Sequence, residues 1–187
     1  MQPIWVWVLI GIVVVLVLWV VATYNGLVQL REKVRNAWSQ IDVLLKRRHD
    51  LIPNLVETVK GYASHEKGTL EAVIAARNAA VAAPSEPGAK GAAEGQLTAA
   101  VRQLFAVAEA YPNLKADQNF LKLQAELADT ENRISSQRSS YNNVVEQYNV
   151  KIMSIPTNLI AGPFGFTPQQ FFEIQDPGQR EVPQVKF

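Results

Sequence analysis

Residues 120–155 read FLKLQAELADTENRISSQRSSYNNVVEQYNVKIMSI, and an apolar or aromatic side chain recurs at every seventh position. These positions are Phe120, Leu127, Ile134, Tyr141, Tyr148 and Ile155. Seven residues make two turns of an α-helix, so the six side chains share one helical face, whereas a strand would alternate with a period of two. The stretch therefore predicts one long helix over 117–155 with a narrow apolar stripe for packing.

A second repeat of seven residues occupies residues 27–55. One line of it is Leu27, Val34, Ile41 and Leu55, and the other is Leu30, Ala37, Leu44 and Leu51. Helices of this length must bury their stripes on one another. We therefore expect an all-α fold, an elongated antiparallel helical bundle over residues 25–156, whose stripes meet within one chain or between chains.

Prolines and glycines set the expected helix ends. Pro53 interrupts the first repeat and predicts a kink, or a new helix capped by Asp50. The pattern then continues to about residue 83. Residues 83–95, APSEPGAKGAAEG, contain two prolines and three glycines, which predict a flexible connector. A short middle helix over 97–108 follows it.

The chain changes character after residue 156. Residues 157–187 are rich in proline and phenylalanine and predict an irregular C-terminal tail. Four of its rings are Phe164, Phe166, Phe171 and Phe172. Because each buried ring contributes roughly 1.5 to 3 kcal/mol, we expect the tail to dock on the bundle or on a neighbouring chain, with disorder as the alternative.

The N-terminal segment, residues 1–24, predicts a membrane anchor. Residues 4–22, IWVWVLIGIVVVLVLWVVA, carry no charged or strongly polar side chain. As a helix they span about 28 Å, close to the roughly 30 Å of bilayer hydrocarbon. The aromatic residues expected at the two membrane interfaces are Trp5, Trp7, Trp19 and Tyr24. No Lys or Arg precedes the segment, as a signal peptide would require, so we predict an uncleaved single-pass helix.

The charges that follow this segment predict its orientation. Arg31, Lys33 and Arg35 lie just beyond it, and the excess of positive charge usually stays on the cytoplasmic side. We therefore expect a bacterial cell-membrane protein with its N-terminus outside and its helical domain in the cytoplasm.

The composition excludes several classes of function. The chain has 187 residues, with 18 basic against 17 acidic side chains, so no net field attracts nucleic acid. It has no cysteine and two histidines, His49 and His65, which would lie about 24 Å apart on a continuous helix. Phosphate-binding loops and nucleophile motifs are missing from the sequence. We predict no cofactor, no metal, no nucleic-acid partner and no enzymatic activity.

Two polar runs are the remaining candidates for a site. The residues are Arg47, Arg48, His49 and Asp50 in the first run, and Asp129 and Arg133 in the second. In one interpretation, Asp129 or Glu131 bridges to the arginines across the bundle and fixes the helical register. In the other, Lys46 to Arg48 hold a phosphate or lipid headgroup.

Long ordered strings of this sequence resemble the LemA family. They are YNGLVQLREKVRNAWSQIDVLLKRRHDLIPNLVETVKGYASHEKGTLEAVIAARNAA, LADTENRISSQRSSYNNVVEQYN, IPTNLIAGPFGF and VPQVKF, which together cover most of residues 24–187. The resemblance implies a single-pass bacterial membrane protein with an antiparallel helical bundle. It implies no enzymatic activity and supplies no catalytic residues.

Two hypotheses for the function follow. The first is a non-enzymatic, membrane-tethered scaffold whose partners are the lipid bilayer and either a second copy of itself or other membrane proteins. The second is an accessory or sensory membrane subunit that binds an anionic ligand or lipid through Lys46 to Asp50.

Overall fold

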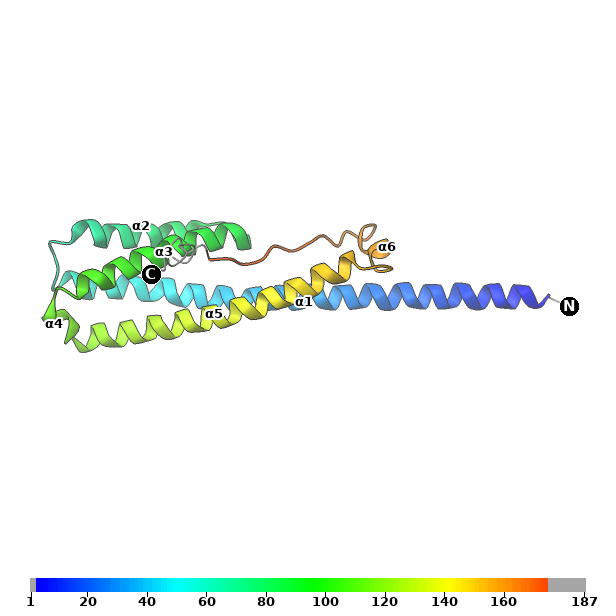
Figure 1. Cartoon of the computed structure of the whole chain (residues 1–187), viewed down its shortest axis with the longest axis horizontal. Coiled ribbons are helices and arrows are strands. Elements are labelled where there is room, and N and C mark those ends of the chain that lie inside the picture. The colour runs from blue at the N-terminus through cyan, green and yellow to red at the C-terminus, as the bar shows by residue number, and fades with distance from the viewer. Residues whose placement is uncertain (1–2, 175–187) are drawn as a thin grey trace, which may run out of the picture. The chain divides into compact units, whose positions relative to one another are not determined.

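The structure is a computed structural model that describes residues 3–174, and within these residues it contains helices and no strand. The helices are α1 (Ile4–Lys60), α2 (Lys67–Ala82), α3 (Pro87–Ala108), α4 (Pro112–Lys115), α5 (Gln118–Met153) and α6 (Asn158–Ala161) (Figure 1). The predicted all-α fold is confirmed. Residues 1–2 of the predicted anchor and 175–187 of the predicted tail lie outside the described residues.

The chain forms two compact units, and both α1 and α5 contribute to each of them. The first unit contains residues 3–38 and 140–169, and the second contains residues 39–139 and 170–174.

In the first unit, the end of α5 packs antiparallel to α1. The rings of Trp38 and Tyr141 lie 5.4 Å apart, and the ring of Tyr24, earlier in α1, meets that of Phe164, later in the chain, at 5.2 Å. Residues 4–22 of α1 have no buried side chain. This unit therefore combines a packed region with a long apolar helix that the protein leaves uncovered.

In the second unit, the chain reverses at residues 61–66, 83–86 and 109–117, so successive long helices run in opposite directions. Figure 1 shows α2 and α3 side by side in this arrangement. Their apolar faces and that of α1 enclose one core. The fully buried members of this core include Ile52, Leu55, Val59, Val73, Ala80, Leu97, Leu104 and Leu114.

The predicted stripes mostly face the interior. The buried residues are Leu27, Val34 and Ile41 on α1, and Phe120, Leu127, Ile134, Tyr141 and Tyr148 on α5. Leu30 and Leu44 are half-buried, and Leu45 takes the interior position after Ile41. The shift arises because a straight α-helix turns every 3.6 residues and drifts away from a strict seven-residue repeat.

Helix α1 differs from the expectation at Pro53, because it continues through this residue without a break and ends at Lys60. The proline lacks the N–H that would bond to the carbonyl of His49. Arg77 of α2 supplies the donor instead, with its Nε 3.1 Å from that carbonyl oxygen. The expected run to residue 83 is therefore two helices joined by a turn.

The expected connector over 83–95 is helical from Pro87 onward, so only residues 83–86 lie between helices. Proline is well tolerated in the first helical turn, where its missing N–H has no helical partner. Gly91 faces the tail, since a Cβ on it would lie 2.1 Å from the carbonyl oxygen of Glu173. Gly91, one of the glycines that suggested a connector, thus permits close packing.

The described part of the tail, up to residue 174, docks on the same chain. Phe172 is buried beside Gly91 of α3 in the second unit, and Phe166 is buried in the first unit. Asn149 fixes the tail in the first unit through two hydrogen bonds. Its side-chain Nδ2 donates to the carbonyl of Gln169 at 2.9 Å, and its Oδ1 accepts from the backbone N–H of Gln169 at 2.8 Å. Phe164 and Phe171 remain exposed.

Candidate functional site

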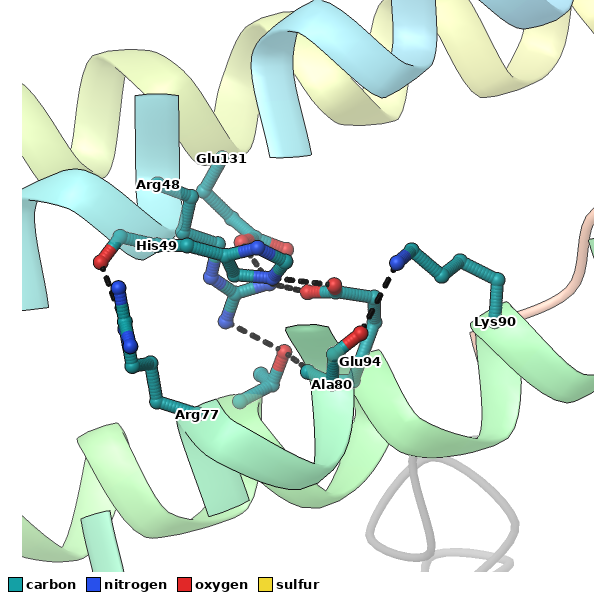
Figure 2. A network of polar contacts seen from close by, with 8 residues as sticks. Arg48, His49, Arg77, Ala80, Lys90, Glu94 and Glu131 are labelled. Atoms are coloured by element: carbon teal, nitrogen blue, oxygen red, sulfur yellow. Dashed lines mark hydrogen bonds and ion pairs between the residues drawn. The ribbon is translucent and has the colours of Figure 1, made fainter. Parts of the chain in front are cut away.

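Buried charged and titratable side chains gather at one place in the second unit. Arg48 and His49 of α1 and Glu94 of α3 are all buried, and Glu94 is 0 % exposed. Charged side chains are almost never buried this completely unless they are paired. Figure 2 shows them pointing toward one another, with Glu131 of α5 beside Arg48. We call these four residues the buried ion cluster.

Glu94 is the centre of the cluster. Its Oε1 lies 2.7 Å from Nε2 of His49, and its Oε2 lies 3.5 Å from Nη1 of Arg48. The same Nη1 lies 3.2 Å from Oε2 of Glu131, which is partly exposed. A single nitrogen of the guanidinium therefore lies between two carboxylates and pairs with both.

A threonine completes the bonding of the guanidinium. Nη2 of Arg48 donates to Oγ1 of Thr98 at 2.7 Å, and that hydroxyl donates in turn to the backbone carbonyl of Glu94 at 2.9 Å. Glu94 and Thr98 are four residues apart and therefore share one face of α3.

The helical periodicity carries these polar residues into the core. Arg48 and His49 follow the buried Leu45 by three and four residues, so they point to the same side of α1. Glu94 precedes the buried Leu97 on α3 by three residues. The cluster therefore joins α1, α3 and α5 at a single level, and sliding any one of these helices along its axis would break it.

Two further cations satisfy backbone carbonyls near the cluster. Arg77 bonds to the carbonyl of His49, as described above. Nζ of Lys90, also buried, donates to the carbonyl of Ala80 at 2.9 Å. Ala80 lies in the last turn of α2, where carbonyls lack helical partners and the helix dipole favours a positive charge. Both cations therefore stabilise irregular points of the helical framework.

The geometry favours a structural role for the cluster. Both carboxylate oxygens of Glu94 are engaged, and both terminal nitrogens of Arg48 face protein acceptors. Within residues 3–174, no group of three or more His, Asp or Glu side chains is arranged to hold a metal ion. A polar hollow of about 280 Å³ opens beside Thr98 and Glu131 and is also lined by Arg102 and Arg138.

The structure separates the six residues that the sequence singled out. Arg48 and His49 enter the cluster, whereas Arg47 and Asp50 are exposed. Asp129 and Arg133 form their own exposed pair along α5, with Nε and Oδ2 2.8 Å apart. The expected bridge from the last helix to the basic run does form, from Glu131 to Arg48.

Sequence reasoning missed Glu94, Thr98, Arg77 and Lys90. Glu94 and Lys90 lie in the segment that the prolines and glycines predict to be a connector, and such a segment has no helical face on which to place them. A signal was present, because the apolar residues from Leu97 to Ala108 recur in steps of four and three, and the same steps continued backward reach Glu94 and Lys90, which the structure buries on that face. These positions are Lys90, Glu94, Leu97, Val101, Leu104 and Ala108.

The aromatic residues expected at the membrane interfaces lie on α1. Trp5 and Trp7 are exposed at its N-terminal end, and Trp19 is half-buried. Tyr24 contacts both Phe164 and Phe166, with ring centroids 5.2 and 5.6 Å apart.

Comparisons with known proteins give both a family match and individual relatives. The family model described as LemA family matches residues 37–187. The chain is similar to magnetosome protein MamQ 2 of Paramagnetospirillum magneticum, with 25% identity over 184 residues that cover 85% of this chain and 68% of the relative. It is 26% identical to magnetosome protein MamQ of Magnetospirillum gryphiswaldense, over 87% of this chain and 70% of the relative. It is also 26% identical to protein LemA of Metamycoplasma hominis, over 73% and 63% of the two chains.

Proposed function

Because the chain belongs to the LemA family, we propose that it is a membrane-anchored helical scaffold that acts by contact with other proteins and catalyses no reaction. Its partners in this proposal are the bilayer and a second copy of the chain or another membrane protein.

The exposure of residues 4–22 carries the proposal. This apolar stretch is long enough to cross a membrane, and none of its most apolar window is buried inside the protein. The core helix of a soluble protein would be covered on at least one face. Lipid is the solvent that suits such a surface.

The contacts of Tyr24 favour an anchor that is retained. Removal of a signal peptide after Ala22 would cut α1 only two residues before this ring, which packs on Phe164 and Phe166. It would also cut a helix that continues into the buried Leu27. Arg31, Lys33 and Arg35 support a cytoplasmic position for the helical domain in a bacterial cell membrane.

The buried ion cluster supports a scaffold more than a ligand-binding subunit. An anion bound by Lys46 to Asp50 would have to compete with Glu94 and Glu131 for Arg48, and His49 is also engaged. Only Lys46, Arg47 and Asp50 of that run face solvent.

Crosslinking in native membranes tests the proposal. We expect bands at multiples of 20.7 kDa, or one partner that recurs across independent preparations. An unrelated single-span protein expressed at the same level is the control for random collision. A chain that gives only the monomer band, or no more product than this control, contradicts the scaffold function.

A further inference from the structure

The turn that follows α5 exposes large apolar side chains close together in sequence. Ile155 is 84 % exposed, Leu159 of α6 is 69 % exposed and Phe164 is 54 % exposed. Isolated exposed apolar residues are ordinary on protein surfaces, but a cluster of them usually marks a binding surface. We call these three residues the apolar turn.

The register of α1 against α5 places this turn beside the predicted end of the membrane span. Trp38 lies opposite Tyr141. Seven residues earlier on α1 and seven residues later on α5, Arg31 lies near Tyr148. Burial raises the pKa of Tyr148, and the positive charge of Arg31 opposes that rise. One further step of seven leads to Tyr24 on α1 and, just past the end of α5 at Met153, to the turn that contains Ile155.

A direct contact supports this register. Phe164, from the same turn, packs edge-on against Tyr24 at 5.2 Å between ring centroids. Tyr24 lies two residues beyond Ala22, or about 3 Å along the helix. The headgroup zone extends roughly 5 to 8 Å beyond the hydrocarbon on each side, so the turn falls within its depth.

The charges near the turn also suit a membrane surface. Between residues 147 and 169 the sequence contains Lys151 and no Asp or Glu, and α1 carries no charged side chain before Arg31. A carboxylate at this level would be repelled by anionic headgroups, whereas Lys151 and Arg31 would be attracted to them.

We propose that Ile155, Leu159 and Phe164 insert into the headgroup boundary of the leaflet that α1 leaves at Tyr24, and so form a second membrane contact. This inference rests on the proposed membrane anchorage. It accounts for the seven-residue repeat, whose first five members lie on α5 and are buried by protein, whereas Ile155, just beyond the end of α5, is exposed and would be covered by lipid. Two contacts would hold the first unit in a fixed orientation on the membrane, where a single helix would let it rotate.

Fluorescence of the full-length chain in vesicles of phosphatidylcholine and phosphatidylglycerol tests the proposal. The chain lacks cysteine, so one cysteine at a time can carry an environment-sensitive dye. Ile155→Cys and Phe164→Cys report on the turn, Val15→Cys reports on the anchor, and the exposed Asn143→Cys reports on water. Quenching is measured with aqueous iodide and with lipids that carry a nitroxide on the headgroup.

We expect the dye at Ile155 and Phe164 to emit at shorter wavelength than at Asn143, to be quenched by the headgroup nitroxide, and to show an iodide quenching constant about threefold lower. With Ile155→Asn and Leu159→Asn added, the dye at Phe164 should lose most of this protection. Neither position is buried, so both variants should fold.

The other outcomes separate the two proposals. Iodide quenching at Ile155 and Phe164 equal to that at Asn143, with Val15 in lipid, overturns the second contact and leaves the anchor standing. Protection at Phe164 that survives both Asn substitutions also overturns it, because the dye would then be shielded by protein. Water exposure at Val15 overturns both proposals.

Discussion

Two parts of helix α1 depart from the usual placement of apolar and charged side chains, each in its own way. Residues 4–22 are apolar, and the protein leaves them uncovered. Residues 39–60 include Arg48 and His49, which are charged or polar and buried in the second unit. In most helices of folded proteins the apolar face is buried and the charged face is exposed to water.

The comparison shows that exposed apolar residues and buried charged residues each need a different partner. An uncovered apolar helix needs a solvent other than water, and in the proposed anchorage the bilayer supplies it. A buried guanidinium needs carboxylates, because its transfer out of water is costly unless it is paired, and Glu94 and Glu131 supply them. The first part of α1 thus indicates where the chain lies, and the second indicates which helices pack together.

Removing the partner of the buried charges should have the largest effect. Glu94→Ala leaves His49 buried without its carboxylate partner and takes one of two carboxylates from the buried Arg48. We expect it to lower the unfolding free energy of the second unit by about 3 to 5 kcal/mol. Urea unfolding of the full-length chain in detergent micelles, followed by helicity and by hydrogen exchange of residues 39–60, measures this loss.

Asp129→Ala is the matched control, because it also removes a carboxylate from an arginine. This pair is exposed, and we expect a loss of less than about 1 kcal/mol. Glu94→Gln should fall between the two, since an amide oxygen still accepts a hydrogen bond. Equal effects at Glu94 and Asp129 would remove the basis for the buried ion cluster.

The contact between α3 and the tail should give the next largest effect. A methyl group at Gly91 meets the backbone of Glu173, so we expect Gly91→Ala to displace residues 170–174 and cost about 1 to 3 kcal/mol. Limited proteolysis near Phe172 should become faster. Gly68→Ala in α2 meets no atom within 4 Å and should be neutral or slightly stabilising, so a similar loss in both variants would argue against the docked tail.

The path of α1 through Pro53 gives a smaller effect that a double-mutant cycle can isolate. Arg77→Met removes the donor to the carbonyl of His49 and should cost about 1 kcal/mol. In a Pro53→Ala background the helix regains its own N–H donor, so the same change should cost close to nothing. An Arg77→Met effect of equal size in both backgrounds would disprove this compensation.

The smallest expected effect is a pH dependence at the start of α5. The backbone N–H of Phe120 and the hydroxyl of Tyr62 both donate to Asp117 and hold the pKa of its carboxyl below the ordinary 3.8. A lowered folded-state pKa contributes stability that is complete above pH 3.8 and is lost as the pH falls through the folded-state value.

Asp117→Asn tests this dependence, because asparagine still caps a helix but does not titrate. We expect little change in the urea midpoint at pH 6 and a flatter decline than in the parent chain below pH 3.8. Parallel acid profiles for the two chains would exclude a contribution from Asp117.

The sequence predicted the parts of this molecule that depend on local periodicity. The spacing of seven predicted α5 to within two residues at its C-terminal end, and the apolar run of residues 4–22 lies without a break on helix α1. The choice of Leu45 over Leu44 was missed, because it depends on how the helical period drifts along α1.

What the sequence missed depends on contacts between distant segments. Gly91 suggests a flexible chain until Glu173 is seen against it, and Pro53 suggests a break until Arg77 is seen to replace the lost hydrogen bond. In both cases a residue that disfavours a helix locally is tolerated because of a partner that is remote in sequence. A single sequence without the fold does not reveal such pairs.

Carbonate extraction of native membranes, followed by the intact mass of the chain, tests the central claim most directly. The account predicts that the protein stays in the membrane pellet at alkaline pH and that its mass includes residues 4–22. A protein found in the soluble fraction, with its sequence beginning near Thr23, would contradict it.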